Sequence, residues 1–268
     1  MAVYNHEDTL AEAIESVLAQ KTKYDYMLYC FNDASTDSSA NILNQYAKAY
    51  PDKIKVYTSP FNQGSGKKSF LYHNPSVVGE YWTLLSGDDY WIDRYKINDQ
   101  VEFLENNSDY VGCSGHTFVK DEVGCSDSVI KPGKSSFNLI DFHLHGNLYT
   151  HPSSITWRNV YRDSGSFLPP LYRKKHSVGD VMLMNAMLAS GRKMKTLPRV
   201  LSCYRITGKG IWSSLPKAKQ DELNFNLKKS LVTMLPIKWR LILILQKVRF
   251  RLKFLHVIIP GPVNIYKY

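Results

Sequence analysis

The stretch Ser86–Trp91, with the sequence SGDDYW, decides the fold of this chain. It directly follows an apolar run, Tyr81–Leu85, whose length and composition predict a buried strand. Two adjacent carboxylates, Asp88 and Asp89, are costly at the exit of such a strand unless a cation binds them. A divalent metal ion that holds a diphosphate fits this pattern, because hard cations prefer oxygen ligands. The alternative is a polar turn, since Gly-Asp is common turn chemistry.

Helices and strands alternate along the chain before this stretch. A capping-box pattern at Thr9–Glu12 predicts a helix that runs to about Gln20. A strand over Tyr26–Phe31, a helix that Pro51 stops and a strand over Ile54–Tyr57 follow. This rhythm implies right-handed crossovers, so we expect an α/β fold with a mostly parallel central sheet flanked by helices.

The basic charge is concentrated at the C-terminus. The formal net charge is +10, yet the segment 223–268 alone has nine Lys or Arg and no acidic residue. The rest of the chain is nearly neutral, which argues against a nucleic-acid-binding face there. The apolar residues of this tail recur at helical spacing and predict a basic amphipathic helix in a membrane interface, or one packed on the main domain. These residues are Leu241, Leu245, Val248, Leu252 and Leu255.

The polar residues that follow the predicted strands gather in three clusters. They are Tyr4-Asn5, the segment Asn32–Asp37 and the segment Gly87–Asp89. In an open parallel sheet, ligands bind at the carboxyl ends of the strands. We therefore expect the three clusters to line one crevice. Met1–Tyr4 itself looks like the end of a strand whose earlier part is absent, as in a fragment.

The parts needed to bind a nucleotide-sugar are present in these clusters. The carboxylate of Asp33 can accept the imide hydrogen of a uracil, and the ring of Tyr4 can stack on the base. A metal at the acidic pair would span two phosphates and stabilise the leaving diphosphate. The alternative for Asn32–Asp37 is a turn and a helix N-cap.

The chain resembles the inverting glycosyltransferases of family 2, which have the Rossmann-like GT-A fold. The order and spacing of several segments carry the resemblance. They are Val3–Glu7, Ser16–Gln20, Asn32–Asp37, Asn62–Gly64 and Gly87–Asp93 with Lys96. The resemblance implies a GT-A domain over residues 1–213. It would comprise a nucleotide-sugar half (1–115) and an acceptor half (137–213), followed by the basic amphipathic extension 214–268.

The resemblance also implies roles for single residues in the nucleotide-sugar half. Tyr4 and Asp33 would hold the nucleobase. Asp88 would lie near the ribose and the metal, and Asp89 would be the principal metal ligand. The metal would be Mg²⁺ or Mn²⁺, and the donor a UDP-sugar.

The acceptor half offers a candidate general base. Asp180 stands where the family has its catalytic acid pair, and a carboxylate can take the proton of an attacking hydroxyl. The alternative is an N-cap aspartate. His151 is expected to face the acceptor, whereas a zinc site is not favoured because the histidine spacing does not fit one. Arg205, with Lys209 and Trp212, is expected to close over the diphosphate.

The leading hypothesis is therefore a metal-dependent inverting glycosyltransferase. It would transfer a sugar to a hydroxyl of a glycan or lipid-linked acceptor in cell-surface polysaccharide synthesis. The expected location is cytoplasmic and peripheral, on the inner face of the plasma membrane, with no nucleic-acid partner. The alternatives are a nucleotidyltransferase, or a catalytically impaired GT-A module that binds nucleotide-sugars.

Overall fold

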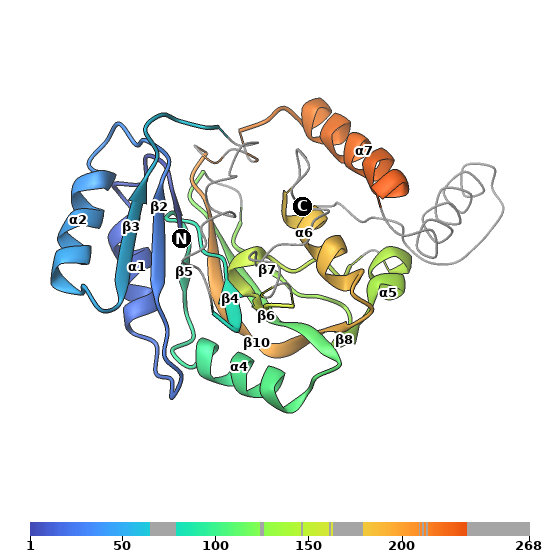
Figure 1. Cartoon of the computed structure of the whole chain (residues 1–268). Helices are drawn as coiled ribbons and strands as arrows, with labels where there is room; N and C mark the ends of the chain where they lie inside the picture. Colours follow the sequence, from blue (N-terminus) through green and yellow to red (C-terminus); the bar gives the residue numbers. More distant parts are fainter. Residues whose placement is uncertain are drawn as a thin grey trace.

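The N-terminal part of the computed structural model is a parallel sheet covered by two helices (Figure 1). The strand order is β1-β2-β3, and both strand pairs are parallel. The elements are β1 (Ala2–Val3), α1 (Leu10–Leu18), β2 (Leu28–Asn32), α2 (Ser39–Ala49) and β3 (Ile54–Thr58). The structure describes residues 1–64, 79–123, 126–145, 147–160, 162, 179–208, 210, 212 and 214–234.

A second, seven-stranded sheet follows, with β4-β9-β6-β10-β5 as its main path. The two long strands β6 and β10 run parallel, and shorter strands join them antiparallel. The strands are β4 (Tyr81–Thr83), β5 (Tyr90–Trp91), β6 (Tyr110–Asp121), β7 (Ser128–Ile130), β8 (Ser136–Phe137), β9 (Thr156–Arg158) and β10 (Lys193–Ile206). The helices of this part are α4 (Lys96–Asn106), α5 (Leu139–Leu144), η1 (Pro152–Ser154), α6 (Gly179–Leu188) and α7 (Lys217–Met234).

The two sheets meet at Ala2. It forms a parallel bridge with Ser86, donating its N–H to the carbonyl of Leu85 (2.9 Å) and accepting from the N–H of Gly87 (2.8 Å). The acidic pair therefore begins where the two sheets join, at the carboxyl end of β1. The α/β fold with a parallel N-terminal sheet is as predicted, whereas the second sheet mixes parallel and antiparallel strands.

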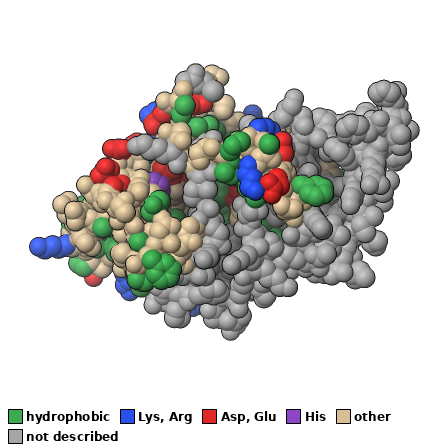
Figure 2. Space-filling view, turned by 90° about the horizontal axis from the view of Figure 1, so that it is seen from above, with side chains coloured by type: hydrophobic (Ala, Val, Ile, Leu, Met, Phe, Trp, Pro, Cys, Tyr) green, Lys and Arg blue, Asp and Glu red, His purple; other side chains and the backbone are tan. Residues whose placement is uncertain are grey.

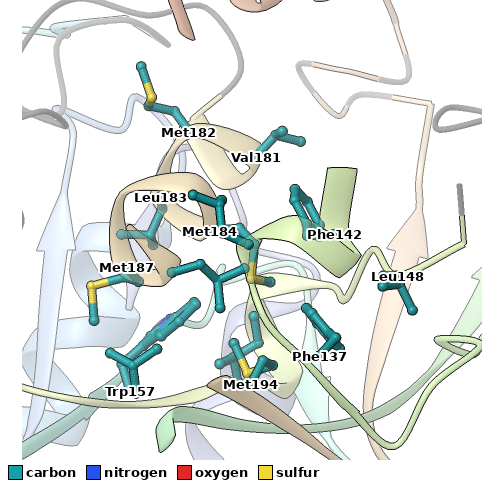
Figure 3. Close-up of a cluster of buried hydrophobic side chains, with 14 of the residues drawn as sticks. Phe137, Phe142, Leu148, Trp157, Val181, Met182, Leu183, Met184, Met187 and Met194 are labelled. Carbon is teal, nitrogen blue, oxygen red and sulfur yellow. The ribbon is translucent and has the colours of Figure 1, made fainter. Parts of the chain in front are cut away.

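Buried hydrophobic side chains form two clusters, and the first extends across this junction to Leu85 and Trp91. It packs α1 against the parallel sheet through residues such as Leu10, Ile14 and Cys30. The other surrounds α6, in which every side chain from residue 181 to residue 188 is buried (Figure 3). Methionines supply much of this second cluster, and their flexible side chains fill irregular space well. The proposed division of the chain at residue 213 stays a prediction.

Helix α4 is anchored by two buried polar side chains. The amine of Lys96 lies 3.2 Å from the Thr83 hydroxyl and 4.4 Å from the centre of the Trp91 ring. Burial lowers the pKa of Lys96 to about 7. One turn later, the amide of Gln100 donates to the carbonyls of Cys113 (2.7 Å) and Ser154 (2.8 Å). These bonds fix η1 against the sheet.

The capping box predicted at Thr9–Glu12 is wrong, although helix α1 does begin there. The Thr9 side chain does not cap the helix. Its hydroxyl donates instead to the carbonyl of Gly87 (2.9 Å), and Glu12 pairs with Arg205. Tertiary partners have thus replaced the local cap: Gly87 in the acidic loop (Ser86–Asp89) and Arg205 in β10.

The predicted tail helix from Leu241 onward lies outside the described residues. Within the part of the chain that the structure describes, no helix is long and apolar enough to span a membrane.

Candidate active site

The loops after β1 and β2 are joined by reciprocal hydrogen bonds. Asn5 donates its N–H to the Ser35 hydroxyl (3.1 Å), and its side-chain oxygen accepts from the N–H of Thr36 (2.8 Å). Next to them, the N–H of Glu7 donates to the carboxylate of Asp37 (3.0 Å). Two of the three predicted strand-end clusters therefore form one continuous rim.

Both loops contain a residue with a left-handed backbone. Asn5 has a φ angle of 53° and Ala34 a φ angle of 55°. Non-glycine residues rarely adopt such angles, and residues that do so cluster at functional sites. The strained backbone thus lies at the ends of β1 and β2, where the sequence predicts ligand binding.

Tyr4 and Asp33, the two predicted nucleobase residues, lie on neighbouring strand ends. The register pairs Val3 with Asn32, so each candidate is the next residue on its strand. Tyr4 is 41% exposed. The carboxylate of Asp33 accepts from the N–H of Gln63 (2.9 Å), which ties the loop after β3 to this edge. Their position suits a base-binding pair, and their role stays a prediction.

The two adjacent carboxylates have different environments. Asp89 is 2% exposed, and its Oδ1 accepts from the backbone N–H of Arg205 (3.2 Å). Burial and the neighbouring charge of Asp88 raise the pKa of Asp89 well above its usual value. The side chain of Asp88 is 18% exposed, with its Oδ2 3.8 Å from Nε2 of His6. Asp88 is therefore the more accessible carboxylate of the pair.

Gly87 is required by the close approach of His6. A Cβ at Gly87 would lie 2.7 Å from Nδ1 of His6 and 3.2 Å from a methyl group of Leu10. A side chain at this position would push His6 away from Asp88. Gly87, directly before the acidic pair, is thus favoured by close packing as well as by the common use of glycine in turns.

Arg205 supports the acidic loop from within the protein. Its side chain is 4% exposed and donates to the backbone carbonyl of Asp88 (3.1 Å). The guanidinium also pairs with Glu12 and lies 4.5 Å from the ring centre of Tyr90. The expectation that Arg205 closes over a diphosphate is wrong, because its donors already bind protein groups. Lys209 lies outside the described residues.

Asp180, the predicted general base, lies in the first turn of α6. Its Oδ2 accepts from the hydroxyl of Tyr149 (2.5 Å), and its Oδ1 accepts from the N–H of Val181 (2.8 Å). The second bond shows that the Asp180 carboxylate accepts from a backbone N–H at the N-terminus of α6. Each oxygen keeps a further lone pair, so a role as proton acceptor is compatible with this contact.

His151 and Tyr204 form a pair of aromatic rings in this region. Their rings stack with centres 4.5 Å apart. Burial lowers the pKa of His151 to about 4, against an opposing influence of the Asp180 and Asp88 charges. Burial, with the charges of Asp89, Asp88 and Asp180, raises the pKa of Tyr204 to about 12. Three of the four sequence-predicted carboxylates, Asp88, Asp89 and Asp180, thus influence the pKa of Tyr204, and two of them influence that of His151.

Viewed from the carboxyl ends of the parallel strands, acidic and histidine side chains lie beside one another on the surface (Figure 2).

The role of Tyr204 as a ring partner was missed by the sequence analysis. The only indication in the sequence was that Tyr204 stands next to Arg205 in a strand.

The residues present fit a metal held mainly by its substrate. No group of three or more His, Cys, Asp or Glu side chains in the described ranges could hold a metal ion alone. Asp88 supplies a reachable carboxylate, and Mg²⁺ commonly takes one or two carboxylates together with substrate phosphates and water. The acidic loop is therefore suited to a metal-diphosphate rather than to a free ion.

Comparison with known proteins shows the family of this chain. The model of glycosyl transferase family 2 matches residues 1–158, more than half of the chain. The chain belongs to glycosyl transferase family 2. The matched range contains both strand-end loops and the acidic pair, so the resemblance found in the sequence is confirmed.

Several curated proteins are similar to this family 2 chain. A putative glycosyltransferase, EpsE of Bacillus subtilis, is 37% identical over 164 residues, which is 60% of this chain and 56% of EpsE. The Escherichia coli β-1,3-glucosyltransferase WfaP, named for UDP-Glc and α-D-GlcNAc-diphosphoundecaprenol, is 30% identical over 124 residues, 46% of this chain and 47% of WfaP. The chain spans 59% of the length of the mycobacterial relatives that it matches at 28% identity.

Solved structures share the GT-A fold. The Staphylococcus aureus TarS fragment 1–349 in complex with UDP-GlcNAc has a TM-score of 0.57 and 16% identity, covering 87% of this chain and 65% of that one. The Pyrobaculum calidifontis mannosyltransferase PcManGT in complex with GDP-Man and Mn²⁺ has a TM-score of 0.52 and 15% identity, covering 90% and 66%. At such identities the likeness shows the fold alone.

Proposed function

We propose that this family 2 chain is a metal-dependent inverting glycosyltransferase that uses a nucleotide-diphosphate sugar. One observation carries the proposal. A series of contacts joins the acidic pair to Asp180. The N–H of Arg205 donates to the carboxylate of Asp89, and the neighbouring Tyr204 stacks on His151. Two residues before His151, the hydroxyl of Tyr149 donates to Asp180 at the start of α6. The acidic loop and the candidate base are thus linked through neighbouring residues, and a displacement at a sugar carbon requires the two to act on one substrate.

The donor would bind along the carboxyl edge of the parallel sheet. Tyr4 and Asp33 would hold the nucleobase, and the acidic loop would receive the diphosphate. Between the two carboxylates, burial favours Asp88 over Asp89 as the principal metal ligand, because Asp89 is enclosed and bonded to Arg205. Asp89 would stabilise the conformation of the acidic loop from its buried side.

The reaction would proceed by direct displacement. Asp180 would accept the proton of an acceptor hydroxyl as that oxygen attacks the anomeric carbon. The bond to the nucleoside diphosphate would break on the opposite side, which inverts the anomeric centre. A bound Mg²⁺ or Mn²⁺ would stabilise the charge that develops on the leaving diphosphate.

The names of the relatives support a UDP-sugar and a lipid-linked acceptor. WfaP is named for UDP-Glc and a diphosphoundecaprenol acceptor, and the TarS complex contains UDP-GlcNAc. We propose that this chain likewise adds a sugar to a glycan or lipid-linked glycan during cell-surface polysaccharide synthesis. It would act in the cytoplasm, on the inner face of the plasma membrane.

The basic extension 214–268 would provide the membrane contact. Each basic residue near an anionic surface adds about 1 kcal/mol of attraction. Co-sedimentation with anionic vesicles, for the full chain and a chain ending at residue 234, tests this across a salt series. Salt-dependent binding of the full chain alone is expected, and equal binding of both refutes a tail contact.

The activity is tested by a donor screen. UDP-glucose, UDP-GlcNAc and GDP-mannose are each incubated with the full chain, with Mn²⁺, with Mg²⁺ and with a chelator, and diphosphate release is measured. Metal-dependent release from one donor is expected. Binding of UDP without release from any donor would favour the impaired binding module. Pyrophosphate release from a nucleoside triphosphate would favour a nucleotidyltransferase.

A further inference from the structure

A chain of hydroxyl groups leads from His151 into the sheet. Nδ1 of His151 lies 2.7 Å from Oγ of Ser153. The Ser153 hydroxyl donates to Oγ of Ser202 (3.1 Å), which in turn lies 3.1 Å from the Thr117 hydroxyl. A hydroxyl has one proton to donate. Since Ser153 gives its proton to Ser202, it must accept one from His151, so Nδ1 carries the ring proton.

The other ring nitrogen is then a bare acceptor. Burial keeps the imidazole neutral near pH 7, with a pKa of about 4, so one nitrogen alone carries a proton. In the described part of the chain, no hydrogen bond engages Nε2 of His151. The charged groups that act on the ring are Asp88 from the acidic loop and Asp180 from α6, and Tyr204 of β10 stacks on it.

The position of His151 is fixed from several sides. The indole N–H of Trp91 donates to the backbone carbonyl of Ser153 (2.9 Å), and Trp91 lies two residues after Asp89. The N–H of Ser154 donates to the carbonyl of His151 (3.0 Å). The imidazole is therefore held in a constant relation to the acidic loop, as a group that contacts a substrate must be.

We propose that His151 recognises a substrate hydroxyl, with its bare Nε2 accepting the hydrogen bond of a sugar that lies between Asp88 and Asp180. This deepens the proposed function and rests on it. The hydroxyl belongs to the donor sugar or to the acceptor. A neutral imidazole with so low a pKa is a poor base near pH 7, so proton removal is left to Asp180 and His151 determines which sugar fits.

The ring state is tested first in the full-length protein without substrate. In ¹⁵N-labelled chain, long-range proton–nitrogen spectra distinguish a protonated from a bare imidazole nitrogen, and His151→Gln assigns the signal among the eight histidines. We expect a protonated Nδ1 and a bare Nε2. Ser153→Ala removes the acceptor of the Nδ1 proton and should mix the two tautomers.

Ser154→Ala is the matched control. Its hydroxyl donates to the backbone carbonyl of His151 (2.8 Å) and does not touch the ring. This variant should keep the wild-type tautomer. A bare Nδ1 in the wild type, or an unchanged tautomer in Ser153→Ala, overturns the inference.

Substrate recognition is tested with deoxy sugars. UDP-glucose, UDP-GlcNAc and deoxy analogues of each are compared for UDP release by the wild type, His151→Gln and His151→Phe. Loss of the recognised hydroxyl should lower kcat/KM of the wild type ~10–100-fold, the scale of one buried hydrogen bond. His151→Phe should lose this discrimination, and His151→Gln, which keeps an acceptor oxygen, should retain part of it.

A second arm separates the two sources of the hydroxyl. Transfer to a GlcNAc-diphosphate-lipid is compared with hydrolysis of the same donor. If His151→Phe impairs transfer but leaves hydrolysis and deoxy discrimination unchanged, the hydroxyl belongs to the acceptor. If His151→Phe matches the wild type in both arms, the inference is refuted. If the wild type uses no donor at all, the proposed function fails instead, and the tautomer measurement still reports on the ring.

Discussion

Glu12 of α1 and Arg205 of β10 form an ion pair that joins the first helix to the last strand of the second sheet. The same arginine binds the backbone carbonyl of Asp88 through its guanidinium, and its N–H donates to the carboxylate of Asp89. The shape of the acidic loop therefore depends on a residue more than a hundred positions further along the chain. Stability and activity should be linked through this contact.

Replacing Arg205 by methionine should destabilise the protein. Removing one partner of a buried charged network typically costs about 3–5 kcal/mol. The matched variant is Glu12→Gln, because the Glu12 side chain is 56% exposed and such a pair contributes at most about 1 kcal/mol. Urea unfolding of both variants measures the difference. Equal losses would mean that Arg205 has no larger role than its surface partner.

Exchanging the two carboxylates for amides should separate their roles. Asp88→Asn should abolish metal-dependent donor binding, because Asp88 is the carboxylate that a ligand can reach. Asp89→Asn should retain measurable metal-dependent binding, since an amide oxygen can still accept from Arg205. Titration calorimetry with Mn²⁺ and UDP measures both. The reverse order would restore Asp89 as the principal ligand.

Replacing Gly87 by alanine should impair the site more than the fold. The added Cβ would meet His6 at 2.7 Å and displace it from Asp88, and overpacking of this kind costs about 1–3 kcal/mol. Gly191→Ala is the control, because its φ angle of 89° makes a side chain unfavourable although no atom lies within 4 Å. Both variants should unfold more easily, and UDP release should fall in Gly87→Ala alone.

Asp180→Asn should leave donor binding nearly intact and reduce transfer ~100-fold or more, the scale of losing a general base. Tyr149→Phe removes the hydroxyl that donates to Asp180 and should produce a smaller loss. Donor affinity and single-turnover transfer are measured on the same samples. A collapse of donor affinity in Asp180→Asn would place this carboxylate in the donor site or in the structural framework.

Lys96 should make stability depend on pH. Its pKa is about 7 in the folded chain, against about 10.4 in an unfolded one, so the unfolded chain binds more protons between these values. The free energy of unfolding contributed by Lys96 should therefore rise from about pH 7 to about pH 9. Lys96→Met should lose this rise, whereas Lys23→Met, at an exposed site, should keep it. Urea midpoints across the range provide the measurement, and a rise that persists in Lys96→Met would contradict the prediction.

The parallel strands and their polar ends could be predicted from the sequence because they depend on local information. Apolar runs, helical spacing and turn residues specify β1, β2 and their loops within short segments. The convergence of these loops then follows from the handedness of the crossovers. The candidate residues Tyr4, Asp33 and Asp88 could be found this way.

The remaining contacts could not be predicted because they depend on pairing between distant segments. Thr9 and Glu12 fit a local capping box, yet Thr9 bonds to the acidic loop and Glu12 pairs with Arg205 instead. The tautomer of His151 depends on hydroxyls from η1, β10 and β6. Such partners are determined by strand register, which a single sequence does not specify.

The junction at Ala2 has a consequence for how the protein opens. The cluster that packs on the parallel sheet extends across this junction to Leu85 and Trp91, so the two sheets share part of one core. Native-state hydrogen exchange can measure how cooperatively such regions open. The amides of Ala2 and Gly87, which bond across the junction, would report its opening directly. A donor bound between Asp33 and Asp180 would contact both sheets and slow exchange in both together. Substrate would then add a further link between the two sheets.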